Sequence, residues 1–198
     1  LYLSLGIALL ALVFSAVMAK GVIDSEEGTP EMQGIATAIQ EGAMAYITRQ
    51  FRTIVLIVVP LCFVVFFTSA EILKSESETA LSFTQSGLYR TLAFITGAVF
   101  SGAIGFLGMW LATRGNIRTT AAATKSDYPG ALKVAIRTGG SVGLATAGLG
   151  LFGATTIILI FQNTSSAILV GFGFGGSLLA LFLRVGGGIF TKAADGGA

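Results

Sequence analysis

Three charged residues follow a long apolar stretch near the end of the chain: Arg184, Lys192 and Asp195, within the segment RVGGGIFTKAADGGA. A charge inside a membrane helix is costly and by default faces the protein interior or water. On a helix, Lys192 would lie about 80° and about 12 Å from Arg184, and Asp195 about 20° and about 16 Å from it. The spacing predicts one polar stripe, in which Lys192 and Asp195 are surface neighbours. Such a stripe could join an anion or metal site to a gated ion path.

A simpler interpretation needs no site. Arg184 would snorkel towards the membrane surface, and Lys192 and Asp195 would form an exposed pair worth under about 1 kcal/mol. The three glycines at 186–188 would let another helix approach closely or would weaken the helix as a hinge. The spacing alone leaves both interpretations open.

The composition indicates which solvent surrounds these residues. The chain has 198 residues, of which 54% are hydrophobic and 11% are charged, whereas soluble domains carry about 25% charged residues. A membrane-spanning helix needs about 20 apolar residues. We therefore predict an all-α membrane protein with about five transmembrane helices, with Pro60 bending the second. The predicted helices cover residues of about 1–19, 54–70, 92–113, 138–161 and 167–190.

The residue types also exclude several kinds of site. The chain has no histidine, which excludes histidine-ligated metals and Ser-His-Asp triads. Its single cysteine, Cys62, cannot form an intrachain disulfide and is expected to be a small apolar-facing residue. The net charge of +2 gives no reason to expect a nucleic-acid partner.

The distribution of charge in the links predicts an orientation. The link 114–137 holds five basic residues against one acid, whereas the link between the second and third runs holds three glutamates against one lysine. Because cytoplasmic loops are enriched in Lys and Arg, we expect the link 114–137 to be cytoplasmic. By alternation the segment 20–52 and the C-terminal end are also cytoplasmic, and the N-terminal end is outside.

The segment from Thr29 to Ile54 has apolar residues at helical spacing. Thr29 before Pro30 fits an N-cap followed by proline at the first helical position. We expect this helix to project from the membrane and to continue into the second apolar run. The alternative is an amphipathic helix that lies on the membrane surface.

Glycines are concentrated in the fourth and fifth runs. In lipid, small residues let helix backbones approach each other closely. The string GFGFGG formally contains GxGxxG at Gly171, Gly173 and Gly176. A dinucleotide-binding fingerprint requires a preceding strand in a βαβ unit, so we interpret these glycines as helix-packing residues.

Three strings in this sequence resemble membrane-integral pyrophosphatases, the pyrophosphate-energised proton or sodium pumps. GGGIFTKAAD is similar to the signature that opens their active site, EGAMAYITRQFRTI to a stretch of their second helix, and RGNIRTTAAAT to the loop after their third. Members of the family have about sixteen membrane helices, so the resemblance makes residues 1–198 a single N-terminal portion of a larger helical domain. It also implies a homodimer in a bacterial inner membrane.

The resemblance implies a Mg²⁺-dependent hydrolysis of cytoplasmic pyrophosphate to two phosphates, coupled to proton or sodium translocation. Lys192 would contact pyrophosphate, and Asp195 would bind one of the accompanying Mg²⁺ ions. Arg184 would belong to the ion-transport gate. The choice between H⁺ and Na⁺ stays open, although protons are favoured because they are the more common transported ion. A requirement for K⁺ also stays open.

The sequence departs from the family pattern after Asp195. Gly196 stands where the family has valine, and a second aspartate of the motif would follow Ala198. We therefore expect a chain truncated at both ends, with no catalytic residue of its own and no activity alone. The rival hypotheses are a secondary transporter or channel module without hydrolysis and a purely structural membrane subunit.

Overall fold

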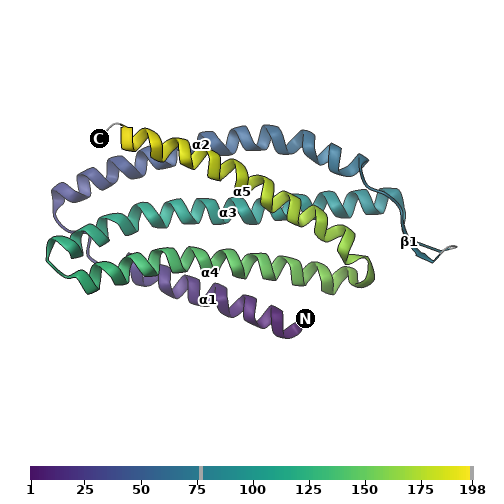
Figure 1. Cartoon of the computed structure of the whole chain (residues 1–198), viewed down its shortest axis with the longest axis horizontal. Helices are drawn as coiled ribbons and strands as arrows, with labels where there is room; N and C mark the ends of the chain where they lie inside the picture. The colour runs from purple at the N-terminus through teal and green to yellow at the C-terminus, as the bar shows by residue number, and fades with distance from the viewer. Residues whose placement is uncertain (76–77, 197–198) are drawn as a thin grey trace. The chain divides into compact units, whose positions relative to one another are not determined.

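The computed structural model describes the backbone of residues 1–75 and 78–196 and the side chains of residues 1–72 and 81–188. The chain forms five long α-helices, one short 3-10 helix and one small hairpin (Figure 1). In chain order these are α1 (Tyr2–Ile23), α2 (Pro30–Phe67), β1 (Ile72–Ser75), β2 (Glu78–Leu81), α3 (Phe83–Thr124), α4 (Tyr128–Phe161), η1 (Gln162–Thr164) and α5 (Ser165–Gly196). The prediction of an all-α membrane protein is confirmed.

Helix α2 begins where the sequence predicts it. The backbone N–H of Met32 donates to Thr29 Oγ1 at 3.4 Å, and Pro30 is the first helical residue. Gly28, just before this cap, has a φ of +81°, a conformation that glycine adopts without strain. The helix then runs through Pro60 without interruption. A single helix from Pro30 to Phe67 confirms that the amphipathic segment continues into the apolar run.

The helices are longer than the apolar runs within them. Helices α2 to α5 have 32 to 42 residues each, which corresponds to about 48 to 63 Å. The hydrocarbon core of a bilayer is about 30 Å thick. Among the described residues, four stretches are long and apolar enough to cross it: α1, α2, α3 and the continuous stretch Tyr128–Gly188. Helices of this length extend beyond the bilayer and can carry residues outside it.

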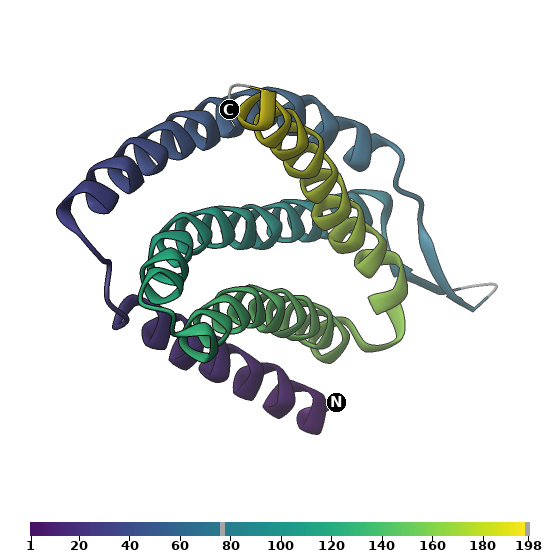
Figure 2. The same ribbon diagram turned by 60° about the vertical axis from the view of Figure 1, so that its left-hand side comes forward.

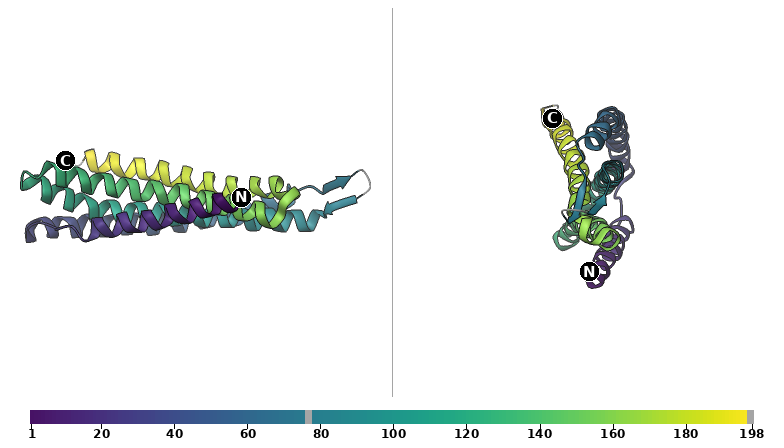
Figure 3. Two further views of the ribbon diagram at one scale, coloured as in Figure 1. Left: turned by 90° about the horizontal axis from the view of Figure 1, so that it is seen from below. Right: turned by 90° about the vertical axis from the view of Figure 1, so that its right-hand side faces the viewer.

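Two connections differ from a simple loop. The basic link 114–137 is helical except at residues 125–127, because α3 continues to Thr124 and α4 starts at Tyr128. The acidic link contains an antiparallel hairpin in which Ile72 pairs with Leu81. This hairpin, which the sequence did not predict, projects past the neighbouring ends of α2 and α3 (Figure 3).

The chain divides into two compact units. Unit 1 comprises Leu1–Leu5, Gln50–Ala103 and Gly150–Ala198, and unit 2 comprises Gly6–Arg49 and Ile104–Leu149. Helices α2, α3 and α4 each contribute one part to each unit, whereas α5 belongs wholly to unit 1.

In unit 2, α1 lies alongside the first part of α4 (Figures 1 and 2). Ser15 Oγ donates to the carbonyl oxygen of Ser141 at 2.7 Å, and Ser141 Oγ donates to that of Ser15 at 2.8 Å. Hydrogen bonds between serines of neighbouring helices are a common means of helix association in membranes. Val22, Leu111 and Val134 form the apolar core of this unit.

In unit 1, α5 packs against α2 and α3. Ile54, Ala98 and Leu179 form one buried cluster, to which each of the three helices contributes a residue. A second cluster holds Ile157 and Ile168 with Ala93 and joins α3, α4 and α5. These clusters fix one face of the helix that carries the predicted stripe.

Candidate functional site on helix α5

Helix α5 gives the predicted stripe a continuous backbone. It is helical from Ser165 to Gly196 and so includes positions 184, 192 and 195. The side chain of Arg184 is exposed. The side chains of Lys192 and Asp195 lie outside the described residues, so their predicted contacts stay predictions.

The buried residues of α5 define its packed face. Ser165, Ile168, Gly171, Gly175, Leu179 and Gly186 are all buried. At about 100° per residue they fall within an arc of about 120°. They therefore mark the side of α5 that faces the other helices of unit 1.

The register of the helix places Arg184 on the opposite side. Arg184 lies about 160° around the helix from Gly186, and position 195 is about 20° from Arg184. Position 192 is about 120° from Gly186. Arg184 is therefore on the face of α5 away from the packed residues, and a stripe that also includes Lys192 and Asp195 stays a prediction.

Glycines bring α5 and α3 into backbone contact. A methyl group at Gly175 would lie 2.0 Å from the carbonyl oxygen of Phe94, and one at Gly97 would lie 2.1 Å from that of Phe172. Gly171 approaches the backbone of α3 in the same way. Only glycine fits at these positions, because any Cβ would overlap a backbone oxygen.

Two of the three glycines of the formal GxGxxG string serve helix packing, as predicted for all three from the sequence. Gly171 and Gly176 face α3, whereas Gly173 has no atom within contact distance of an added methyl group. At the GGG segment, a methyl group at Gly187 or Gly188 would likewise meet nothing among the described residues. The helix is continuous there.

The motif EGAMAYITRQFRTI in α2 contacts α5 close to Arg184. Gln50 Nε2 donates to the carbonyl oxygen of Phe182 at 3.2 Å. Phe51, the next residue, packs with Phe182 around the cluster that contains Leu179. This contact of Gln50 was not predicted, although the residue lies in the string EGAMAYITRQFRTI. Its amide anchors α5 two residues before the arginine of the stripe.

The third motif, RGNIRTTAAAT, contains a buried arginine with a structural role in unit 2. Arg118 is 5% exposed, and its guanidinium donates to the carbonyl oxygens of Ile23 and Ser25, each at 3.1 Å. It also pairs with Glu27 Oε1 at 2.7 Å. Arg118 therefore satisfies carbonyl groups at and after the end of α1, which otherwise lack helical partners. Sequence analysis missed this role, because the partners lie more than 90 residues away.

The described part of the chain has no group of three or more His, Cys, Asp or Glu side chains able to hold a metal. On α5, Asp195 is the only carboxylate. Mg²⁺ in phosphate-binding sites commonly takes one or two carboxylates together with phosphate oxygens and water. Asp195 thus fits the donor chemistry of such a site, but the chain supplies at most part of it.

Comparison with known proteins identifies the family of the chain. A family model described as inorganic H+ pyrophosphatase matches residues 9–198. A K(+)-insensitive pyrophosphate-energized proton pump of Streptomyces coelicolor is 42% identical over 97% of this chain and 24% of its own length. Proteins with the same name from Chloroflexus aurantiacus and Methanosarcina mazei are 43% and 40% identical, over 25% and 26% of their lengths.

The chain therefore spans about a quarter of the length of the curated relatives it matches. The three strings that resemble this family lie within the matched residues. The resemblance predicted from them is confirmed: the chain belongs to the inorganic H+ pyrophosphatase family.

Proposed function

We propose that the intact protein hydrolyses pyrophosphate and couples the hydrolysis to proton transport across the membrane. The observation that carries this proposal is GGGIFTKAAD on α5, with the exposed Arg184 on the same helix about two turns before Lys192. Family membership and the names of the relatives support it. Residues 1–198 contribute only part of the site, because they offer the substrate one lysine, Lys192, and one carboxylate, Asp195.

In this proposal the three charges have separate tasks. Lys192 binds a phosphate oxygen, for which a compact ammonium group is well suited. Asp195 helps to hold Mg²⁺, which neutralises charge on the phosphate oxygens when it is bound. Arg184 lies about 12 Å before Lys192 along α5 and forms part of the gate for the transported ion.

We propose protons as the transported ion, and no requirement for K⁺. Three relatives at 40–43% identity are named K(+)-insensitive proton pumps. A Na⁺ dependence of transport in the intact protein would refute the first statement, and stimulation by K⁺ would refute the second.

We also propose that the protein crosses the bacterial plasma membrane several times with positions 192 and 195 on the cytoplasmic side. The charge bias of the links supports this orientation. A cysteine introduced at the exposed Lys125, in a Cys62→Ser background, tests it. Labelling of that cysteine by an impermeant maleimide in inside-out vesicles, and protection in intact cells, is the expected result. The reverse pattern would place the basic link outside.

The central experiment uses the intact protein in proteoliposomes. Pyrophosphate should be hydrolysed only with Mg²⁺, and the vesicle lumen should become acidic. We expect Lys192→Ala and Asp195→Ala each to abolish both activities, and Arg184→Ala to abolish acidification. Lys20→Ala removes an exposed lysine of unit 2 and is the matched control, with both activities kept.

The same assay separates the rival functions. Full hydrolysis in both the Lys192→Ala and Asp195→Ala variants would refute the site assignment. Transport without any pyrophosphate hydrolysis would instead support a secondary transporter or channel. The implied homodimer stays a prediction, and a monomeric mass for the active protein in mass photometry would contradict it. The chain 1–198 expressed alone should show no hydrolysis.

A further inference from the structure

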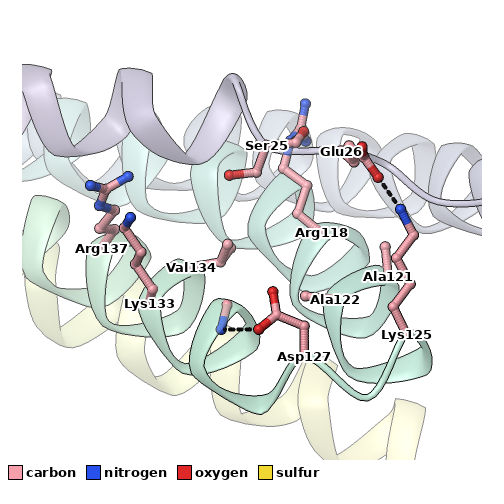
Figure 4. Close-up of a pocket in the computed structure, with 11 residues that line it drawn as sticks. Ser25, Glu26, Arg118, Ala121, Ala122, Lys125, Asp127, Lys133, Val134 and Arg137 are labelled. Atoms are coloured by element: carbon pink, nitrogen blue, oxygen red, sulfur yellow. Dashed lines mark hydrogen bonds and ion pairs between the residues drawn. The ribbon is translucent and has the colours of Figure 1, made fainter.

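A polar pocket of about 330 Å³ lies in unit 2 (Figure 4). Residues near the end of α1, the end of α3 and the start of α4 line it. Its charged residues are the cations Arg118, Lys125, Lys133 and Arg137 and the anions Glu26 and Asp127. The pocket therefore has more positive than negative groups.

Both carboxylates of the pocket are already engaged. Glu26 pairs with Lys125, whose hydrogen bond and charge lower the pKa of Glu26 below its usual range. Asp127 Oδ1 accepts the backbone N–H of Gly130 at 3.0 Å and so caps the start of α4. Among the described residues, neither carboxylate forms an ion pair with Lys133 or Arg137.

The remaining cations are Lys133 and Arg137. They lie one helical turn apart on α4 and extend from the same side of it in Figure 4. Within the described part of the chain, neither makes a hydrogen bond or an ion pair. Arg118, by contrast, already donates to carbonyl groups and to Glu27. Two adjacent cations therefore line one pocket without a counter-ion.

The guanidinium of Arg137 has a defined place. A methyl group at Gly21 would lie 2.8 Å from Arg137 Nη1, so the guanidinium lies close against α1 at this glycine. Arg137 is half-buried. A group packed in this way loses less freedom when it binds a ligand than a fully exposed arginine does.

The position of the two cations along α4 indicates which kind of ligand they could bind. Arg137 directly precedes the apolar run of 138–161, so it lies at the edge of the hydrocarbon region, where lipid phosphates are found. Basic pockets between membrane helices bind anionic headgroups in this region. Arginine and lysine both bind phosphate oxygens through charge-assisted hydrogen bonds.

We propose that this pocket binds a phosphate group, held by Lys133 and Arg137. The group belongs to an anionic phospholipid headgroup or to free inorganic phosphate. The residues that hold the phosphate do not include those of the predicted stripe, and the proposal does not depend on pyrophosphate hydrolysis.

The test measures binding to the intact protein in detergent. Native mass spectrometry follows the addition of phosphatidylglycerol, with phosphatidylcholine as the uncharged comparison, and calorimetry follows inorganic phosphate. Binding of phosphatidylglycerol in excess of phosphatidylcholine assigns the pocket to a headgroup. Binding of inorganic phosphate without that excess assigns it to the free anion. No binding of either ligand overturns the proposal.

Variants localise the binding. Lys133→Gln and Arg137→Gln should each weaken it about fivefold, and the double variant about 25-fold, since a cation near an anionic headgroup is worth about 1 kcal/mol. Lys20→Gln also removes an exposed lysine of unit 2, but one outside the pocket, and should leave binding unchanged. Equal affinity in the wild type and the double variant would overturn the assignment to this pocket.

Discussion

Replacing Gly175 by alanine should push α5 away from α3 and destabilise unit 1. The added methyl group would lie 2.0 Å from the carbonyl oxygen of Phe94. Even a close carbon–oxygen contact is about 3.3 Å, so the two backbones must separate by about 1.3 Å. Neither atom belongs to a flexible side chain that could turn aside.

The expected cost follows from two opposing effects. Forcing an extra methyl group into a packed interface costs about 1–3 kcal/mol, or occasionally more. Alanine is favoured over glycine in a helix by about 1 kcal/mol, which offsets part of this. Because the obstacle is backbone, we expect the upper end of the range and a net loss of about 2 kcal/mol.

The matched control is Gly173→Ala, two residues earlier on the same helix. No atom lies within 4 Å of a methyl group at Gly173, so only the gain in helix propensity applies there. Thermal unfolding of the intact protein in detergent should show a lower midpoint for Gly175→Ala and an equal or higher one for Gly173→Ala. Equal midpoints for the two variants would refute the backbone contact between α3 and α5.

Two further predictions concern unit 2. Arg118→Met should cost about 3 kcal/mol of unfolding free energy, because two partly buried carbonyl groups and the Glu27 carboxylate all lose their donor. Arg114→Met, which removes a guanidinium 4.3 Å from the Trp110 ring centroid, should cost under about 1 kcal/mol; equal losses in denaturant titration would contradict this account. Ser15→Ala should cost about 0.6–1.7 kcal/mol, and a coupling energy near zero with Ser141→Ala in a double-mutant cycle would show that the serine pair contributes nothing.

Local signals in the sequence predicted the start of α2 but not the contacts of the glycines. Thr29 and Pro30 act on the backbone within one turn, so their effect is readable from neighbours alone. Gly171, Gly173 and Gly175 look equivalent in sequence, yet only Gly171 and Gly175 touch the backbone of α3. Which side of α5 meets α3 depends on packing between segments about 75 residues apart, and periodicity cannot supply it.

The charged links show a similar limit. Counting Lys and Arg in 114–137 treats all five as one exposed patch, whereas Arg118 is buried and committed to the end of α1. Lys133 and Arg137 have no ion-pair partner among the described residues. They can be distinguished from Arg118 only when the position of α1 beside α4 is known. The hairpin of β1 and β2 has strands of four residues each, too short for a clear alternation of polar and apolar residues.

The open face of α5 combines properties that suit neither lipid nor water alone. Leu181 is 57% exposed and Val185 is 56% exposed, and Arg184 stands between them. In contact with lipid, the arginine would cost about 2.5–3.5 kcal/mol near the bilayer centre. In contact with water, Leu181 and Val185 would lose the favourable free energy of burying apolar surface. Both costs are avoided where further helices cover Leu181 and Val185 and leave a narrow polar path at Arg184. The relatives have about three quarters of their length beyond the matched region, so further segments are available in those proteins to pack on the corresponding face. We therefore expect this mixed face of α5 to contact another helix rather than lipid.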